Sequence, residues 1–326
     1  MPDAPAPRTV GVAGAGAWGT ALSLAASRAG HRVTLWGRDP AHLAALAASR
    51  ANDRHLPGTP LDPAITPTHD PAALLTTDPL LLAVPAQAVR ETCRLLAGYR
   101  GRLVICAKGL ERSTGLRLSE VVRHELPDAI PSALSGPSFA RELAFGLPTA
   151  VTVAADHLPD AAALASLLAT PAFRPYPSDD LPGVELAGAL KNVVAIAAGA
   201  VAGLSLGENA RAALITRGLA EMSRLAEALG ARRETLTGLS GLGDLLLTAT
   251  SATSRNTSLG LALARGAPPA AALAEGASTA EAACRLAANV GVDLPIADAV
   301  RRVLAGEVTV DEAVGLLLGR PLAGRE

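Results

Sequence analysis

The amino-acid sequence predicts an α/β fold, with a doubly wound sheet in the N-terminal half and an all-α domain in the C-terminal half. Three observations predict it. A strand pattern over 9–13 ends in glycines and leads into a helical pattern over 18–28 and a second strand over 32–36, the size of a parallel β-α-β crossover. The second half of the chain carries helical patterns and nothing typical of a paired strand. At 326 residues, the chain exceeds what one hydrophobic core usually fills.

Strand and helix patterns continue to alternate after this β-α-β unit, as expected for a Rossmann-type sheet. The expected strands are 80–84, 103–107 and 150–154, and the expected helices are 86–96, 116–125 and 159–168. A proline-rich stretch over 171–182 follows. We place the domain boundary there, between a dinucleotide-binding domain of residues 1–180 and a helical substrate-binding and catalytic domain of residues 181–326.

The expected helices of the C-terminal domain are rich in Ala and Leu and are separated by Gly, Pro and Asn. They are 184–202, 208–230, 257–265, 269–274, 279–290, 295–304 and 310–318. The longest apolar run, 193–206, is too short and too interrupted by glycine to cross a bilayer, so no membrane span is expected. The N-terminal residues lead straight into a strand and not into a signal-peptide hydrophobic region, so a cytoplasmic location is expected.

The charges nearly cancel, with 29 Lys and Arg against 30 Asp and Glu. This balance provides no basic surface for nucleic acid or anionic lipid. Neither the cysteines, Cys93, Cys106 and Cys284, nor the six histidines have the spacing of metal ligands. We therefore expect no metal, reduced thiols, and histidines in surface or turn positions.

The glycines after the first strand fit the G-x-G-x-x-G pattern, with Gly14, Gly16 and Gly19 between a strand and a helix. In a dinucleotide site, the first glycine makes the turn and the second lets the backbone approach the pyrophosphate. The third allows close packing of helix and strand, and the helix N-terminus supplies N–H donors. The alternative is a glycine-rich turn between packed elements.

The end of the second strand bears on which nicotinamide cofactor is used. An NAD site would present an Asp or Glu there for the ribose 2′-hydroxyl, but the chain continues from Trp36 with Gly37 and Arg38. A glycine followed by an arginine suits a 2′-phosphate, so NADP(H) is preferred and NAD(H) remains an alternative. Asp39 lies one residue beyond the position expected of a ribose ligand, but it is not excluded. The alternative for Arg38 is a solvated cation in a loop.

Two lysines occupy places that suggest chemistry. Lys108 follows an apolar strand, at the sheet edge where ligands bind in open α/β sheets, although an exposed loop lysine is the alternative. Lys191 interrupts an otherwise apolar helix and must be paired or face a wet cleft. Asp244 is its expected partner. Such a lysine could protonate a carbonyl oxygen as hydride reaches carbon, while a structural ion pair is the other interpretation.

The tripeptide 254–256 combines a serine at a helix start with a guanidinium and an amide, which is a compact phosphate receptor. A helix cap alone would give the same pattern. Together with the lysines and the glycine loop, it indicates a reductase of a small phosphorylated or acidic carbonyl compound.

Several blocks of the sequence, in this order and spacing, resemble those of bacterial-type NAD(P)-dependent glycerol-3-phosphate dehydrogenases. The blocks are 14–21, 107–111, 134–140, 190–193, 239–244 and 254–256, so the likeness runs nearly end to end. The resemblance implies reversible hydride transfer between NAD(P)H and dihydroxyacetone phosphate. The product is sn-glycerol 3-phosphate for glycerophospholipid biosynthesis.

Carried over to the matching positions, the resemblance implies that Lys191 is the catalytic proton donor and acceptor. The implied substrate contacts are Lys108, Gly136, Ser138, Asn192, Asp244, Ser254, Arg255 and Asn256, the last two facing the phosphate. The implied cofactor contacts are Ala17, Trp18, Arg38, Lys108, Ala140, Arg255 and Glu275, beside the loop glycines. Residues 277–279, after Glu275, lack the more polar residues that the family usually has there.

Two other functions stay open from the residues. One is a 3-hydroxyacid or 6-phosphogluconate-type dehydrogenase, from which the phosphate block at 254–256 distinguishes this chain. The other is a nicotinamide-sensing regulator. Lys108, Lys191 and Asp244 argue against it, because a sensor does not need a proton relay. The expected partner is a small-molecule substrate, and a homodimer is left open.

Overall fold

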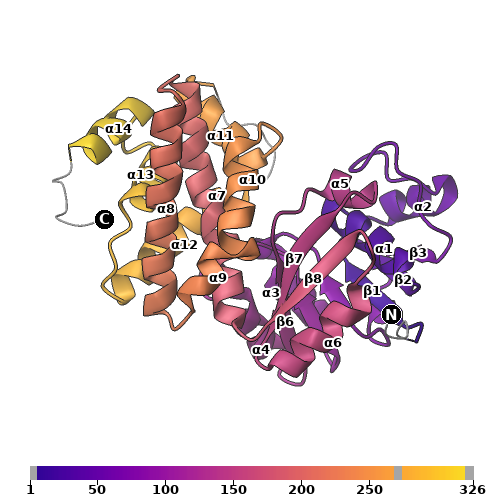
Figure 1. Cartoon of the computed structure of the whole chain (residues 1–326). Coiled ribbons are helices and arrows are strands. Elements are labelled where there is room, and N and C mark those ends of the chain that lie inside the picture. The colour runs from indigo at the N-terminus through magenta and orange to yellow at the C-terminus, as the bar shows by residue number, and fades with distance from the viewer. Residues whose placement is uncertain (1–5, 268–273, 320–326) are drawn as a thin grey trace. The chain divides into compact units, whose positions relative to one another are not determined.

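The computed structural model describes residues 6–267 and 274–319, and the chain forms two compact units (Figure 1). Unit 1 comprises Met1–Lys108 and Leu116–Glu185, and unit 2 comprises Gly109–Gly115 and Leu186–Glu326. The chain thus visits unit 2 briefly, returns to unit 1, and then enters unit 2 again. The segment Gly109–Gly115 is only seven residues long, and no sequence pattern indicates that it belongs to unit 2.

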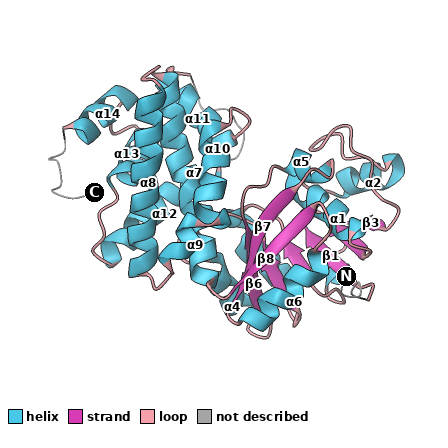
Figure 2. Cartoon of the chain, viewed as in Figure 1, coloured by secondary structure: helices cyan, strands magenta, loops and turns pink. Residues whose placement is uncertain are grey.

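All strands of the described residues belong to unit 1 and form one eight-stranded sheet (Figure 2). The strands are β1 Thr9–Ala13, β2 Arg32–Trp36, β3 Ile65–Thr68, β4 Leu80–Leu82, β5 Arg102–Ile105, β6 Ile130–Ser135, β7 Thr149–Ala155 and β8 Phe173–Ser178. Their order is β3-β2-β1-β4-β5-β6-β7-β8, so the order reverses beside β1. This reversal is the point where ligands bind in doubly wound sheets. The predicted fold class is confirmed.

One pair of strands departs from the parallel pattern. β7 runs antiparallel to β6, while all other neighbours in the sheet are parallel. Between them lies only the short helix α5 (Ala140–Ala144), and a full parallel crossover needs a dozen or more residues.

Alternate strand residues bury themselves on opposite faces of the sheet, which makes three layers. On one face, strand residues such as Val10, Val12 and Val104 pack with α1, α2, α5 and α6. On the other face, Leu80, Leu103 and their neighbours pack with α3 and α4. The bounds are α1 Ala17–Arg28, α2 Pro40–Ser49, α3 Val89–Leu95, α4 Leu118–Glu125 and α6 Leu158–Leu168, with short 3-10 turns η1 Pro71–Leu74 and η2 Ala86–Ala88.

The proline-rich stretch over 171–182 is structured, which the sequence interpretation did not foresee. It contains β8, and β3 at the opposite edge contains Pro67. Both are outermost strands of the sheet. Proline has no N–H to donate, and an edge strand can place this missing donor on its unpaired outer side. Prolines also hide such strands from pattern recognition.

The regular elements of unit 2 within the described residues are all helices, while Gly109–Gly115 forms a turn. The helices are α7 Leu181–Gly203, α8 Glu208–Ala228, α9 Arg233–Thr237, α10 Asp244–Thr250, α11 Arg255–Ala264, α12 Glu275–Asn289, α13 Pro295–Leu304 and α14 Val310–Leu318, with a π turn η3 at Leu239–Gly243. The first residues of α7 belong to unit 1. The helix expected over 269–274 lies, apart from its last residue, outside the described residues.

Helix α7 is the core of unit 2. It is long and apolar enough to cross a membrane, but 78% of its most apolar window is buried inside the protein. Glycines let its neighbours approach closely: a Cβ on Gly199 would lie 2.0 Å from Thr257 O, and one on Gly260 of α11 would lie 1.8 Å from Ile196 O. The apolar, glycine-containing sequence of α7 is therefore explained by its burial and by the close approach of α11.

The histidine expectation needs one correction. His31 is 1% exposed, its Nε2 lies 2.8 Å from Leu167 O, and its Nδ1 accepts a hydrogen bond from Arg8 N. It follows Gly30 in the tight connection to β2, where a polar residue can be buried because the backbone supplies partners.

Candidate active site

The glycine loop at the end of β1 has a distinct geometry at each glycine. Gly14 has φ +121°, in the region that favours glycine, and a Cβ there would lie 2.7 Å from Ala83 O. A Cβ on Gly19 would lie 1.8 Å from Gly14 O, so this glycine lets α1 pack on the loop. A Cβ on Gly16 would meet nothing within 4 Å. The loop is therefore closely packed at its first and third glycines and open at the second, as a pyrophosphate group requires.

Residues beside the loop border the apolar cluster under the same face of the sheet. Ala17, Trp18 and Ala140 pack against it while remaining partly exposed. The indole Nε1 of Trp18 is buried and has no hydrogen-bond partner within residues 6–267 and 274–319. A buried donor without a partner is uncommon, and a bound ligand is one way to satisfy it.

The turn after β2 contains an exposed arginine and an aspartate that is already bonded within the protein. Gly37 packs closely, since a Cβ there would lie 2.7 Å from Leu43 Cδ2. Arg38 is exposed and forms a long ion pair, 4.0 Å from Nη1 to Oε2, with the exposed Glu91. Asp39 caps α2 by accepting from His42 N at 3.1 Å, and it pairs with Arg54 Nη1 at 3.1 Å. The His42 N–H bond, together with Arg54, holds the pKa of Asp39 below its usual value.

A second group of candidates lies at the carboxyl ends of β5 and β6. Lys108 Nζ and Ser138 Oγ each donate to Gly136 O, both at 2.9 Å. Gly136 has φ +143°, and a Cβ there would lie 2.9 Å from Val151 Cα. A side chain would therefore be strained here, and the carbonyl that collects both side chains depends on glycine.

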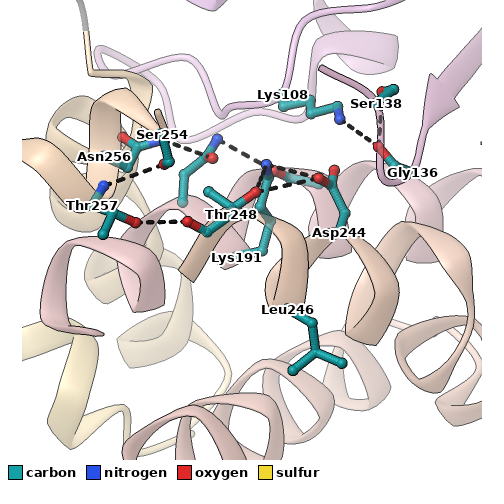
Figure 3. A network of polar contacts seen from close by, with 12 residues as sticks. Lys108, Gly136, Ser138, Lys191, Asp244, Leu246, Thr248, Ser254, Asn256 and Thr257 are labelled. Atoms are coloured by element: carbon teal, nitrogen blue, oxygen red, sulfur yellow. Dashed lines mark hydrogen bonds and ion pairs between the residues drawn. The ribbon is translucent and has the colours of Figure 1, made fainter. Parts of the chain in front are cut away.

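The core of unit 2 holds a buried ammonium that is bonded to an aspartate and a threonine (Figure 3). Lys191 Nζ donates to Asp244 Oδ1 at 3.0 Å and to Thr248 Oγ1 at 2.7 Å. Lys191 is 6% exposed and Asp244 is 2% exposed. The predicted partnership of these two residues is present, and it compensates the burial of both charges.

Thr248 is a residue that the sequence interpretation missed. Its Oγ1 lies between the two charges and is also 3.3 Å from Asp244 Oδ1. The available signal was its spacing of four residues from Asp244, which puts both side chains on one face of α10. Leu246, between them in sequence, points away from the network (Figure 3).

The residues before α10 explain how Asp244 comes to lie there. The π turn η3 ends at Gly243, whose N–H bonds to Gly238 O at 3.1 Å. A Cβ on Gly241 would lie 2.0 Å from Leu236 O. The glycines of block 239–244 thus allow a wide, underwound π turn directly ahead of the buried aspartate, and π turns are frequent at functional sites.

Two asparagines join three helices next to this network. Asn256 Nδ2 donates to Asn192 Oδ1 at 2.8 Å, and Asn256 Oδ1 accepts from Gly276 N at 3.1 Å. They lie on α11 and α7, and Gly276 is in the first turn of α12. Glu275, the first residue of α12, is therefore held beside Asn256.

The candidate phosphate receptor forms the start of α11. Ser254 is the N-cap, and its Oγ accepts from Thr257 N at 3.3 Å, so the capping interpretation of this serine is realised. Arg255, the first residue of the helix, is exposed. The N-terminus of a helix with an exposed guanidinium provides both fixed N–H donors and a mobile cation for an anion.

Metal-ligand clusters and buried thiols are two other features of the described ranges, residues 6–267 and 274–319. These residues contain no group of three or more His, Cys, Asp or Glu that could hold a metal ion. Cys93 and Cys106 are free and buried, and burial raises the pKa of each thiol to about 12. Thiols with such values are not nucleophiles at neutral pH.

Two family models and a curated relative show the family of this chain. A family model described as NAD-dependent glycerol-3-phosphate dehydrogenase N-terminus matches residues 9–161, and its C-terminus counterpart matches residues 180–315. A protein of Methylobacterium radiotolerans named glycerol-3-phosphate dehydrogenase (NAD(P)+) is 53% identical over 323 residues, which is 97% of either chain.

Solved structures agree with these matches. The crystal structure of glycerol-3-phosphate dehydrogenase from Coxiella burnetii is 39% identical, with a TM-score of 0.92 over 97% of this chain and 100% of that chain. A glycerol-3-phosphate dehydrogenase of Saccharomyces cerevisiae is 26% identical, with a TM-score of 0.82 over 95% and 99%.

Proposed function

The chain belongs to the NAD-dependent glycerol-3-phosphate dehydrogenase family, and from this membership we propose the reaction that its residues carry out. It reversibly reduces dihydroxyacetone phosphate to sn-glycerol 3-phosphate, the backbone of glycerophospholipids, with NAD(P)H. The cofactor, when bound, supplies the hydride that goes to the carbonyl carbon. The chain must supply a proton for the carbonyl oxygen, a receptor for the phosphate, and a site for the dinucleotide.

The observation that carries the proposal is the Lys191 network. The ammonium is buried and is held by Asp244 Oδ1 and Thr248 Oγ1. These two acceptors orient its Nζ and help to keep it charged in an apolar helix core, where an ammonium can act as a proton donor. Lys191 gives that proton to the carbonyl oxygen as the alcohol forms, and solvent returns one to the amine. In the oxidation of the alcohol the same atom takes the proton back.

Binding of the triose phosphate uses residues from the remaining blocks. Arg255 and the N–H groups at the start of α11 are suited to the phosphate, with Ser254 and Asn256 ordering that helix end. Lys108, Gly136 and Ser138, which share one carbonyl, and Asn192, next to Lys191, complete the proposed substrate contacts.

The dinucleotide belongs at the open glycine loop. Gly16, where a Cβ would meet nothing, is the point of approach for the pyrophosphate. The proposed contacts are Gly14, Gly16, Ala17, Trp18, Gly19, Arg38, Lys108, Ala140, Arg255 and Glu275.

Among the two nicotinamide cofactors we propose a preference for NADP(H). Asp39, the acidic residue nearest to the end of β2, caps α2 and pairs with Arg54, so its carboxylate is engaged and partly neutralised. Arg38 is exposed and available for a 2′-phosphate. An aspartate that is already bonded is a poor ligand for the ribose hydroxyls of NAD.

We also propose a cytoplasmic location and assembly as a homodimer. The first is supported by free thiols at Cys93, Cys106 and Cys284, which suit a reducing compartment. Light scattering on the purified chain tests the second.

Steady-state rates test the function directly. We expect turnover of dihydroxyacetone phosphate with either cofactor, a higher kcat/KM with NADPH than with NADH, and negligible rates with 3-hydroxyacids or 6-phosphogluconate. Turnover of a hydroxyacid in preference to the triose phosphate would favour the related dehydrogenases. Cofactor binding without turnover of any of these compounds would favour a nicotinamide sensor.

A further inference from the structure

Asn52, between α2 and β3, contacts the glycine loop from inside the protein. It is 1% exposed, and its Nδ2 donates to Ala15 O at 3.0 Å and to Thr20 Oγ1 at 2.7 Å. Ala15 is inside the loop, and Thr20 is in the first turns of α1. No motif in the sequence pointed to this asparagine, which is 32 residues from Thr20.

Thr20 extends this contact to the next carbonyl of the loop. Its Oγ1 donates to Gly16 O at 2.9 Å, and its N–H bonds to the same oxygen at 3.0 Å. Asn52 therefore reaches Ala15 O directly and Gly16 O through the hydroxyl of Thr20.

Fixing these two carbonyls fixes the direction of two N–H groups. In a trans peptide the C=O and the following N–H point in opposite directions. With Ala15 O held toward the interior, the N–H of Gly16 points out of the loop. The N–H of Ala17 is directed away from Gly16 O in the same way. Outward N–H groups at the start of this helix are the donors that a pyrophosphate accepts from.

The segment around Asn52 is itself held firmly. Asn52 O accepts from Leu56 N at 2.7 Å and from His55 N at 3.1 Å, and Leu56 is buried in the core of this face. Arg50 adopts φ 53°, an uncommon conformation for a residue with a side chain, and its Nη1 donates to Ile65 O at 2.9 Å. A rigid support is what a positioning residue needs.

We propose that Asn52 is a positioning residue for the dinucleotide, which orients the N–H donors of the glycine loop without touching the ligand. The inference rests on the proposed function, since it assumes that the loop binds NAD(P)H. Only the donor half of the amide takes part, because Asn52 Oδ1 has no hydrogen-bond partner in the described part of the chain.

Asn52→Leu tests this role, because leucine has nearly the same shape and no donor. We expect the Kd for NADPH, measured by calorimetry, to rise about tenfold, as the loss of one or two hydrogen bonds would allow. At saturating NADPH we expect kcat and the KM for dihydroxyacetone phosphate to stay within about twofold of wild type. A defect of this kind separates cofactor binding from chemistry.

Tyr99→Phe is the matched control. Tyr99 is buried in unit 1 on the other face of the sheet, and its hydroxyl donates to Thr77 O at 3.1 Å or to Arg102 O at 3.0 Å. The Tyr99→Phe variant loses buried hydrogen bonding in unit 1 that does not involve the glycine loop. We expect a lower melting temperature and an unchanged Kd for NADPH.

Thr20→Val and Thr20→Ser provide a second, independent comparison should Asn52→Leu fail to fold. Valine removes the hydroxyl that links Asn52 to Gly16 O, and serine retains it. We expect valine to weaken NADPH binding and serine to restore it. The proposal is wrong if Asn52→Leu, or Thr20→Val in its place, changes the Kd no more than Tyr99→Phe does, or lowers kcat as much as it raises the Kd. Wild-type protein that binds no nicotinamide would instead refute the proposed function.

Discussion

Lys191 and Asp244 form a buried ion pair, with 3.0 Å between Nζ and Oδ1, that joins α7 to α10 in the core of unit 2. Desolvation makes such a pair a weak source of stability, and removing one partner leaves an uncompensated charge. A pair of this kind in an apolar core is better explained by chemistry than by folding.

Replacing Lys191 by Met should abolish catalysis while retaining the cofactor site. We expect kcat to fall by about 100-fold or more, the usual contribution of a general acid, with the Kd for NADPH unchanged. The variant should also lose about 3 to 5 kcal/mol of stability, because Asp244 stays buried and charged. Adding Asp244→Asn should recover stability without activity. A single variant that keeps most of its kcat would remove Lys191 from the mechanism.

The two glycines that flank Trp18 should respond in opposite ways to alanine. A Cβ on Gly16 meets nothing, so Gly16→Ala should fold normally and bind NADPH at least tenfold more weakly. A Cβ on Gly19 would lie 1.8 Å from Gly14 O, so Gly19→Ala should lower the melting temperature. Calorimetric binding and thermal unfolding distinguish the two defects. Normal NADPH binding by Gly16→Ala would contradict the assignment of the loop.

Arg255→Ala should act mainly on the phosphorylated substrate. Losing a charge-assisted contact to phosphate should raise the KM for dihydroxyacetone phosphate by about 10- to 100-fold, with a smaller change in kcat. Arg265, exposed at the other end of α11, is the matched control, and Arg265→Ala should leave KM unaltered. Equal KM values for both variants would reduce Arg255 to a helix-start residue.

Gly260 on α11 should be intolerant of any side chain. An alanine Cβ would lie 1.8 Å from Ile196 O and 2.8 Å from Ala200 N, both backbone atoms of α7, so Gly260→Ala should cost about 3 kcal/mol or more. Because α7 carries Lys191, activity should fall as well. Gly315 in α14 meets nothing, and Gly315→Ala should stabilise by up to about 1 kcal/mol through helix propensity. Urea denaturation measures both, and similar stabilities would contradict the close helix crossing.

Glu221 makes stability depend on pH near neutrality. Its carboxylate accepts from Ile296 N at 2.8 Å and Ala297 N at 3.3 Å at the start of α13. Burial nevertheless raises the pKa of Glu221 from 4.5 to about 7. Because the folded-state pKa is the higher one, the folded protein holds this proton more tightly than the unfolded chain. The resulting stability is complete below about pH 4.5 and is lost as pH rises through about 7.

Glu221→Gln isolates this effect because glutamine does not titrate. The unfolding free energy of wild type relative to the variant should fall by up to about 3 kcal/mol between roughly pH 5 and pH 8. Denaturation curves at several pH values provide the comparison. If the unfolding free energies of the two proteins changed with pH in parallel, Glu221 would have an ordinary pKa in the folded protein.

Pattern recognition worked where a local rule was sufficient. The first strand, the glycine loop and its helix follow one another directly, so their types and order are encoded within about 30 residues. Lys191 was conspicuous because a charge in an apolar helix must find a partner, and Asp244 is that partner. The family, the activity and the fold class predicted from the sequence are confirmed.

Other features had no local signal. Strands β3 and β8 contain prolines, which suit their positions at the two edges of the sheet but hide them from a search for strand patterns. Asn52 reaches the loop from a separate segment, and Asn256 joins three helices. The predicted boundary at residue 180 and the roles of the individual site residues stay predictions.

The sequence by itself determined which residue types are available for the chemistry and how strands and helices alternate along much of the chain. Periodicity, glycine spacing and charges in apolar runs are local properties. Only the tertiary structure decided which donors and acceptors meet. Thr248 completes the lysine network, Asp39 is engaged by Arg54, and Asn52 supports the glycine loop, since each of these contacts depends on elements packing together. Contacts between distant segments are set by burial in a shared core, and a linear pattern does not contain that information.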